Sequence, residues 1–87
     1  MTVAATFDAL GDPTRRQIVA FLQAGESPVA EIASQFSSSG PAVSQHLKVL
    51  RDAGLVKVRP DRQRRIYSIN QAALIEAAEW LLMMGKD

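Results

Sequence analysis

The sequence contains no cysteine, a single histidine and no long apolar run, and each absence excludes a class of protein. Without cysteine there are no disulfides, thiolate metal sites or cysteine nucleophiles, which fits a reducing compartment. No apolar stretch approaches the roughly 18 residues that span a bilayer. No basic segment leads into an apolar run with a small-residue cleavage site. We therefore expect a cytoplasmic chain that is neither exported nor membrane-bound.

Catalytic signatures are missing as well. The sequence shows no nucleophile beside an orienting base and no glycine-rich loop that would cradle a phosphate. His46 is alone, and such a histidine more often packs or hydrogen-bonds than binds a metal or acts in catalysis. Glu76 and Glu79 lie three residues apart with no histidine or cysteine near them, which favours a solvent-exposed helix face. We expect no enzyme activity, no cofactor and no metal site.

Charge is nearly balanced over the whole chain but strongly unbalanced within it. The net charge is +1, yet residues 40–70 hold seven lysines and arginines against two aspartates, a net of +5. The rest of the chain holds three basic against seven acidic residues, a net of −4. One basic segment in a nearly neutral protein is typical of a chain that presents a single face to a polyanion.

The 87 residues, of which 47% are hydrophobic, predict one small globular domain over 1–87. A domain of this size buries only about 60% of the surface that its unfolded chain exposes. Association with a second chain is a common source of extra stability for so small a core. A dimer is therefore the working expectation.

Local signals predict two helices before residue 25. The first lies within residues 2–10 and ends at Gly11. Asp12 provides a side-chain acceptor and Pro13 suits a first helical turn, so the second helix begins here and ends by Gly25. The residues expected on the core sides of these helices are Val3, Phe7, Leu10, Ile18, Phe21 and Leu22.

Two further helices are predicted before residue 55, joined by a tight turn at residues 37–40. Ser27 and Pro28 indicate the start of a third helix of about ten residues. Ser39 caps the fourth helix, which ends at Gly54. The residues expected to be buried are Val29, Ile32, Ala33 and Phe36, then Val43, Leu47 and Leu50, with Leu55 folded back on Leu50. Two such helices joined by a short turn predict a helix-turn-helix.

After residue 55 the apolar period changes from 3.6 to 2, which predicts a β-hairpin of residues 56–59 and 66–69 with a charged connection at 60–64. Asn70 caps a last helix, in which nearly every residue from 72 to 84 is apolar. Apolar residues cover more than one face of that helix, so it needs a second partner surface. The predicted fold is mainly α with a small β-hairpin, a winged helix-turn-helix of order ααααββα.

The fourth predicted helix has the chemistry to read a DNA major groove. Its outward side carries Pro41, Ala42, Ser44, Gln45 and Lys48, none of them bulky. Glutamine and serine hydrogen-bond base edges, and backbone N–H groups at a helix start, here near Ser39 and Gly40, suit a phosphate. An ordinary amphipathic surface helix has the same pattern. The hairpin favours DNA, because Arg62, Arg64 and Arg65 suit phosphate clamping or entry into a minor groove, although solvated charge is the alternative.

Three segments together resemble the ArsR family of winged helix-turn-helix repressors over essentially the whole chain. They are LGDPTRRQI at 10–18, AVSQHLKVLRDAGLV at 42–56 and IYSI at 66–69. In that family they open the second helix, form the recognition helix and form the second wing strand. The resemblance implies a repressor that binds double-stranded operator DNA as a homodimer.

The resemblance also assigns roles to residues. Gly40, Pro41, Ser44 and Gln45 match base-contacting positions, and Lys48 with the wing arginines matches phosphate contacts. The first and last helices, 2–10 and 72–84, would pair across a two-fold axis. The side chains expected in that dimer interface are Val3, Phe7, Leu74, Ala78, Leu81 and Leu82.

The chain departs from metal-sensing members of the family at both known sensor positions. Residues 28–33 hold no cysteine, and residues 72–84 hold no histidine. It resembles the short members without a sensor, some of which repress their own operon and are countered by a partner protein. Arg62 replaces a wing glycine that those members often carry. The inducer is then either a protein or a small apolar ligand in an interface pocket lined by Trp80, Met83 and Met84.

A second function stays open from the residues alone. In that interpretation the chain is a winged-helix interaction module that docks a protein partner through its wing and last helix. The net +5 of residues 40–70 favours DNA, whereas a homodimer and a different partner explain the apolar last helix equally well.

Overall fold

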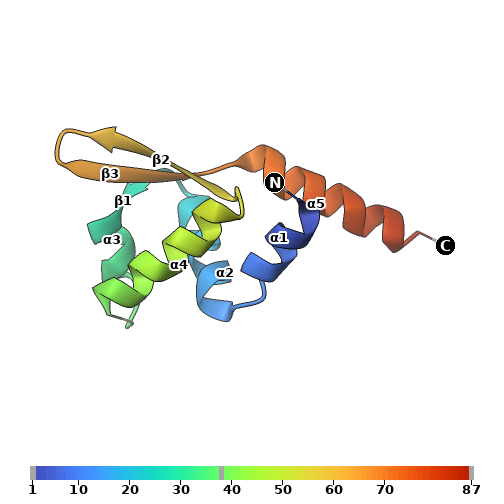
Figure 1. The fold of residues 1–87 in the computed structure, drawn as a ribbon, viewed down its shortest axis with the longest axis horizontal. Coiled ribbons are helices and arrows are strands. Elements are labelled where there is room, and N and C mark those ends of the chain that lie inside the picture. Colours follow the sequence, from blue (N-terminus) through green and yellow to red (C-terminus); the bar gives the residue numbers. More distant parts are fainter. Residues whose placement is uncertain (1, 38, 87) are drawn as a thin grey trace.

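Five helices and three short strands follow one another along residues 2–37 and 39–86, the part of the chain that the computed structural model describes (Figure 1). In chain order they are α1 (Val3–Ala9), α2 (Pro13–Leu22), β1 (Ser27–Pro28), α3 (Val29–Ser34), α4 (Gly40–Asp52), β2 (Val56–Asp61), β3 (Arg64–Ile69) and α5 (Gln71–Met84). The body measures 48 × 25 × 21 Å, with the β2–β3 hairpin at one end and α5 at the other (Figure 1).

One apolar core joins the helices to the sheet. Its largest fully buried side chains are Val43, Leu47 and Leu50 of α4, Ile18 of α2, Ile32 of α3, and Leu55. All six were predicted to face the core, because the spacing of apolar residues identifies the buried side of a helix. The prediction of a mainly helical chain with a small sheet is confirmed.

The sheet has three strands rather than the two expected. Its order is β1–β3–β2, and both pairings are antiparallel. Ser27 lies opposite Tyr67 and Pro28 opposite Ile66, so the segment predicted to start the third helix instead covers one edge of β3. Ser27 is buried, and its hydroxyl donates to Glu31 Oε2 at 3.4 Å.

The third helix is shorter than the predicted ten residues, since α3 has six. Its residue before the first turn is Pro28, which provides no side-chain cap. At its end, the Ser34 hydroxyl donates to the Glu31 carbonyl at 2.7 Å, a bond that competes with the helical one. The predicted turn at 37–40 includes Ser38, which lies outside the described residues.

The predicted starts of the second and fourth helices are confirmed. The Asp12 carboxylate accepts from the Arg15 N–H at 3.1 Å and caps α2, while the Ser39 hydroxyl accepts from the Ala42 N–H at 3.3 Å and caps α4. Asn70 precedes α5 as predicted but makes no side-chain cap. Its amide instead donates to the Gly54 carbonyl at 2.9 Å, which ties the start of α5 to the end of α4.

The first helix faces the core with other residues than those predicted. Thr6 and Ala9 are its buried residues, whereas Val3, Phe7 and Leu10 are only half-buried. Helix α1 packs against α5, and the Phe7 and Trp80 rings meet edge to face with their centroids 5.5 Å apart. Of the predicted stripe, Leu10 packs against the core, whereas Val3 and Phe7 do not belong to the core cluster.

Candidate nucleic-acid interface

Helix α4 is fixed along its apolar side and at both ends, which leaves one polar side facing outward. Gly40, Pro41, Ser44, Gln45 and Lys48 are all exposed on it. No side chain among them is larger than glutamine or lysine, so a surface of DNA can approach the helix closely.

A Schellman motif ends α4 and fixes its direction. Gly54 takes a φ of 82°, its N–H donates to the Arg51 carbonyl at 2.9 Å, and the Leu55 N–H donates to the Leu50 carbonyl at 3.0 Å. Leu50 and Leu55 are both fully buried, which is the apolar contact that accompanies this motif. The predicted return of Leu55 onto Leu50 is confirmed, and it leads the chain directly into β2.

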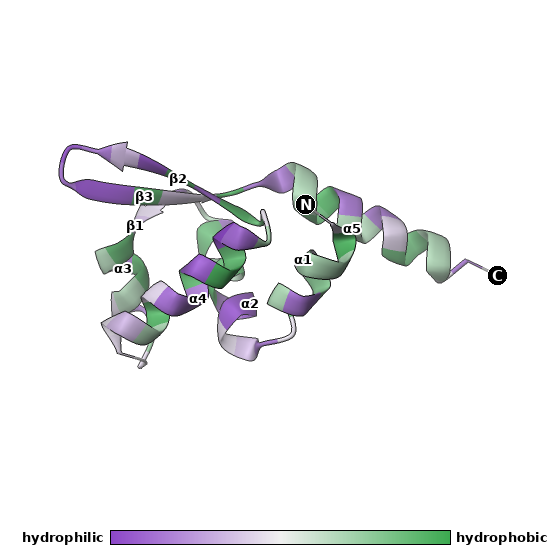
Figure 2. Ribbon diagram, viewed as in Figure 1, coloured by the Kyte–Doolittle hydropathy of each residue, from purple (hydrophilic) through white to green (hydrophobic). Residues whose placement is uncertain are grey.

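The hairpin formed by β2 and β3 has a connection shorter than the predicted residues 60–64. Pairing continues to Asp61 and Arg64, so Arg62 and Gln63 alone form the turn. Arg62 has a φ of 59°, in the left-handed region that favours glycine. Arg62 thus has a glycine-like backbone and places a charged side chain at the tip of the hairpin. Figure 2 shows this end of the molecule as hydrophilic.

An open groove of about 490 Å³ lies between α3, α4 and the hairpin. Ser44 lines it from α4, Gln63, Arg64 and Arg65 line it from the hairpin, and Pro28, Val29, Ala30 and Tyr67 complete it. The structure therefore brings residues of the predicted groove-reading helix and of the wing to one concave surface. Gln45 and Lys48 do not line this groove and lie further along the exposed side of α4.

Three of the basic residues of the interface are paired with carboxylates of the chain itself. Lys48 Nζ lies 2.8 Å from Asp52 Oδ2, and Arg64 Nη2 lies 3.1 Å from Asp61 Oδ2. Hydrogen bonding from Lys48 lowers the pKa of Asp52 below its usual value. These pairs are exposed and hence weak, so a phosphate can replace the carboxylate.

The third pair lies at the base of the wing, where Arg59 Nη2 is 2.5 Å and Arg59 Nε 3.4 Å from the Glu26 carboxylate. The two hydrogen bonds from Arg59 are a bidentate contact, and they raise the pKa of the guanidinium. Within the described residues, Arg62 and Arg65 make no ion pair. Arg51 of α4 and Lys57 of β2 are also exposed and make no ion pair within the described residues, so unpaired positive charge lies at the wing tip and on both flanking elements.

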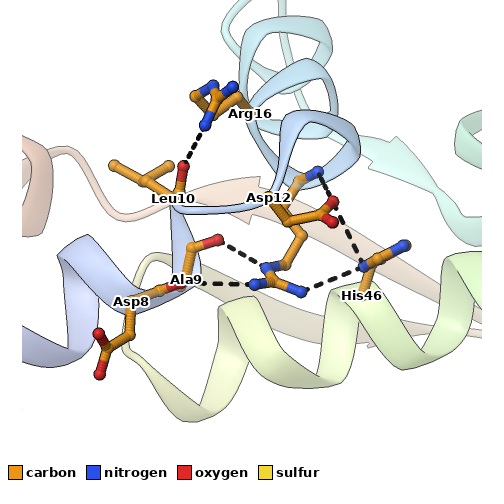
Figure 3. A network of polar contacts seen from close by, with 7 residues as sticks. Asp8, Ala9, Leu10, Asp12, Arg16 and His46 are labelled. Atoms are coloured by element: carbon orange, nitrogen blue, oxygen red, sulfur yellow. Dashed lines mark hydrogen bonds and ion pairs between the residues drawn. The ribbon is translucent and has the colours of Figure 1, made fainter.

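His46 lies on the side of α4 that faces the start of α2, not on the outward side, and belongs to a polar network there (Figure 3). Its Nδ1 atom lies 3.4 Å from Arg15 Nη1 and 4.0 Å from Asp12 Oδ2. The pKa of Asp12 is lowered, chiefly because its carboxylate accepts the Arg15 N–H, with the nearby His46 also favouring the charged form. The prediction of a hydrogen-bonding role for His46 agrees with this contact.

The opposite end of the molecule is apolar and exposed. Ala77 is the buried residue of α5 and Leu74 packs against the core, but the last part of the helix extends beyond the body (Figure 1). Large apolar side chains stay in solvent there, with exposed fractions of 54% for Leu81, 74% for Leu82 and 70% for Met83. Of the predicted interface residues, Leu81, Leu82 and Ala78 are exposed, whereas Val3, Phe7 and Leu74 are half-buried.

Comparison with known proteins decides the family. A profile described as "Bacterial regulatory protein, arsR family" matches residues 12–58, more than half of the chain. The transcriptional repressor SdpR of Bacillus subtilis is 36% identical over 76 residues, covering 87% of this chain and 84% of SdpR. This chain belongs to the ArsR family. It is a transcriptional regulator rather than an enzyme.

Other ArsR-type proteins extend the match. The HTH-type transcriptional regulator Rv2034 of Mycobacterium tuberculosis is 48% identical over 68 residues, which cover 78% of this chain and 64% of that protein. An ArsR-like transcriptional regulator from Rhodococcus sp. RHA1 superposes with a TM-score of 0.85 at 29% identity, covering 95% of this chain and 78% of that one. The likeness to this solved ArsR-type structure confirms the winged helix-turn-helix prediction.

Two features of this ArsR-family chain were missed by sequence reasoning. The Arg15 contact with His46 joins residues 31 positions apart, and the Glu26 pair with Arg59 joins residues 33 apart. No local pattern predicts such contacts. Arg15 belongs to the segment 10–18 that carries the family resemblance, and Arg59 belongs to the basic segment 40–70. Within the described residues, no three His, Cys, Asp or Glu side chains come together as a metal site would require, and no helix is long and apolar enough to cross a membrane.

Proposed function

We propose that this chain is a homodimeric ArsR-family repressor that binds operator DNA, with α4 in the major groove and the hairpin on the adjacent backbone or minor groove. One observation carries the proposal. Ser44 of α4 and the wing residues Arg64 and Arg65 line a single groove. A helix flanked by a basic hairpin suits the two kinds of contact that DNA offers, base edges and phosphates.

The proposed base contacts lie in the first half of α4. Gln45 is exposed and its amide matches the donor and acceptor pair of adenine, while Ser44 reaches either donor or acceptor groups. Pro41 and Gly40 give an approach without bulk, and the Gly40 N–H at the first position of the helix suits a phosphate. These residues would carry sequence specificity.

The proposed phosphate contacts are basic and sequence-independent. Arg62 and Arg65 are exposed at the wing, and Lys48 and Arg64 exchange their intramolecular carboxylates for phosphates. An exposed ion pair contributes little, so the exchange costs little. Counterion release from DNA would then supply affinity that falls steeply with salt.

The proposed dimer uses α1 and α5. Leu81, Leu82 and Met83 lie on the part of α5 that the rest of the chain does not cover, and monomeric proteins rarely leave so contiguous an apolar patch in water. A two-fold arrangement would cover the patch with its own copy and place one α4 in each half of a palindromic site.

We further propose that the inducer is not a metal ion. The sequence provides no cysteine and one histidine, and Arg15 already engages that histidine. A partner protein or a small apolar ligand near Trp80, Met83 and Met84 then releases the DNA. Micromolar zinc or a chelator should leave operator binding unchanged, whereas zinc-induced release reversed by chelator would contradict this part of the proposal.

The decisive test is binding of the purified chain to the DNA upstream of its own gene. Fluorescence anisotropy would compare that duplex with a scrambled duplex of equal composition at about 50 mM and about 200 mM salt. We expect the upstream duplex to bind at least about a thousandfold more tightly, with both affinities falling as salt rises. Equal binding to the two duplexes would contradict specific recognition. Binding to neither would favour the alternative, a module that docks a protein through the wing and α5.

A further inference from the structure

A single guanidinium joins the end of α1 to the middle of α4 (Figure 3). Arg15 donates from Nε to the Ala9 carbonyl at 2.6 Å and from Nη2 to the Asp8 carbonyl at 3.4 Å, and its Nη1 lies 3.4 Å from His46 Nδ1. The first two acceptors belong to the last turn of α1, and the third belongs to α4. Three elements that are separate in the sequence thus meet at one side chain.

The chemistry of arginine makes this contact restrictive. Its donors are held in a rigid planar fork, so engaging both helices with one fork fixes their relative position. The carbonyls at the end of a helix lack intrahelical partners and carry partial negative charge, which favours a cation there. Asp12 holds the start of α2, and with it the backbone of Arg15, through its cap at 3.1 Å.

We propose that Arg15 is a positioning residue that sets the direction of α4 relative to α1, and thereby the spacing between the two DNA half-sites that a dimer accepts. The inference rests on the proposed function. Helix α1 packs against α5, the proposed dimer element, and His46 directly follows Gln45, the proposed base-reading residue. The Arg15 contact is therefore a polar connection between the helix that packs on the proposed dimer element and the middle of the proposed DNA-reading helix.

A small change in the direction of α4 is enough to alter how the protein fits its DNA site. Helix α4 has 13 residues and so measures about 20 Å along its axis. A tilt of about 10° shifts its far end by about 3 Å, close to the rise of one base pair. In a two-fold dimer the same tilt occurs twice, so loss of the contact would broaden the range of half-site spacings that the protein accepts.

The chain contains a matched control in the next residue. Arg16 Nη1 donates to the Leu10 carbonyl at 2.7 Å, also just beyond α1, but contacts no residue of α4 within the described part of the chain. Arg16→Gln therefore removes one charge and one bond to the α1 end. Arg15→Gln removes one charge, two bonds to the end of α1 and the contact with α4.

The experiment uses the full chain and three duplexes. One is the preferred duplex that the wild-type protein selects from a random pool, and the others have one base pair added or removed between the half-sites. Affinities would be measured by anisotropy, with light scattering and thermal unfolding of each variant as controls for dimer and fold. We expect the wild type and Arg16→Gln to prefer the selected spacing by about tenfold or more, and Arg15→Gln to prefer it by about twofold or less, with unchanged dimer mass.

A second pair of variants keeps the test decisive if Arg15→Gln unfolds. His46→Leu removes the acceptor on α4 and should lose the spacing preference, whereas His46→Asn keeps an acceptor near the Nδ1 position and should retain most of it. Equal weakening of all three duplexes, or a lower Tm with intact spacing preference, would overturn the inference and leave Arg15 a structural residue. A wild type that selects no duplex would instead overturn the proposed function, and this inference with it.

Discussion

The two ends of this molecule differ in chemistry and in the way their structure is held. The hairpin end is basic and hydrophilic, and its strands are paired on both sides of β3 and anchored by Tyr67 and Ile69 in the core. The α5 end is apolar, and beyond Ala77 it extends into solvent with Leu82 74% exposed. The hairpin strands are therefore paired within one chain, whereas the last part of α5 leaves apolar surface in water. A polar end is well hydrated on its own, but an exposed apolar end is stabilised when a second surface covers it, as in the proposed dimer.

The largest effect is expected from a charge on the apolar end. Leu81→Glu would place a carboxylate in the proposed interface, where an unpaired buried charge costs several kcal/mol. We expect light scattering to report half the dimer mass and operator affinity to fall by more than about a hundredfold. Ala20→Glu, which adds the same side chain at an exposed position of α2 outside the proposed interface, should remain dimeric. A wild type that is a folded monomer at micromolar concentration would contradict the dimer.

The next effect is expected at the hairpin end of the molecule, where it separates base reading by α4 from phosphate binding by the wing. Gln45→Ala should weaken the operator complex by about 1–3 kcal/mol and leave random DNA almost unaffected, because only the specific complex uses the amide. Gln35→Ala removes an exposed glutamine outside α4 and serves as the control. An equal loss on both duplexes would show that Gln45 does not read a base.

Arg64→Ala should behave differently from Gln45→Ala. Loss of a phosphate contact weakens operator and random duplexes by the same factor and lowers the slope of log affinity against log salt by about one unit per contact. Titration at several salt concentrations measures that slope. If both this variant and Gln45→Ala leave duplex binding unchanged, the interface lies elsewhere on the molecule.

The smallest effect has the opposite sign. Asp61 competes with DNA for Arg64, since the two side chains are paired at 3.1 Å, so Asp61→Asn should raise affinity for all duplexes by about two- to fivefold. The double variant with Arg64→Ala should lose most of this gain, because the released arginine is no longer present. A gain that persists in the double variant would assign the effect of Asp61 to long-range charge alone.

Features with a local cause could be predicted from the sequence. The caps at Asp12 and Ser39, the buried side of α4 and the motif at Gly54 each depend on residues within one or two turns. The two strands of the hairpin followed from alternation, although the turn between them was expected to be longer than Arg62 and Gln63. The exposed positions of the candidate site on α4 followed from the same periodicity.

Features created by distant pairing could not be predicted. Ser27 and Pro28 have the local chemistry of a helix start, yet they lie in a strand because the edge of β3, about forty residues later, supplies backbone partners. The Asn70 amide likewise donates to the Gly54 carbonyl and does not cap α5. The contact of Arg15 with His46 also joins distant residues, so the sequence did not predict that Arg15 contacts α4.

Arg62 has opposite effects on the stability of the fold and on the proposed binding of DNA. A residue other than glycine at a φ of 59° costs on the order of 1 kcal/mol. Arg62 is exposed at the tip of the wing, so burial of its side chain does not offset this cost. Glycine at this position would relax the turn but remove a cation from the tip. A substitution that makes the turn more stable would therefore weaken the proposed contact of the wing tip with DNA.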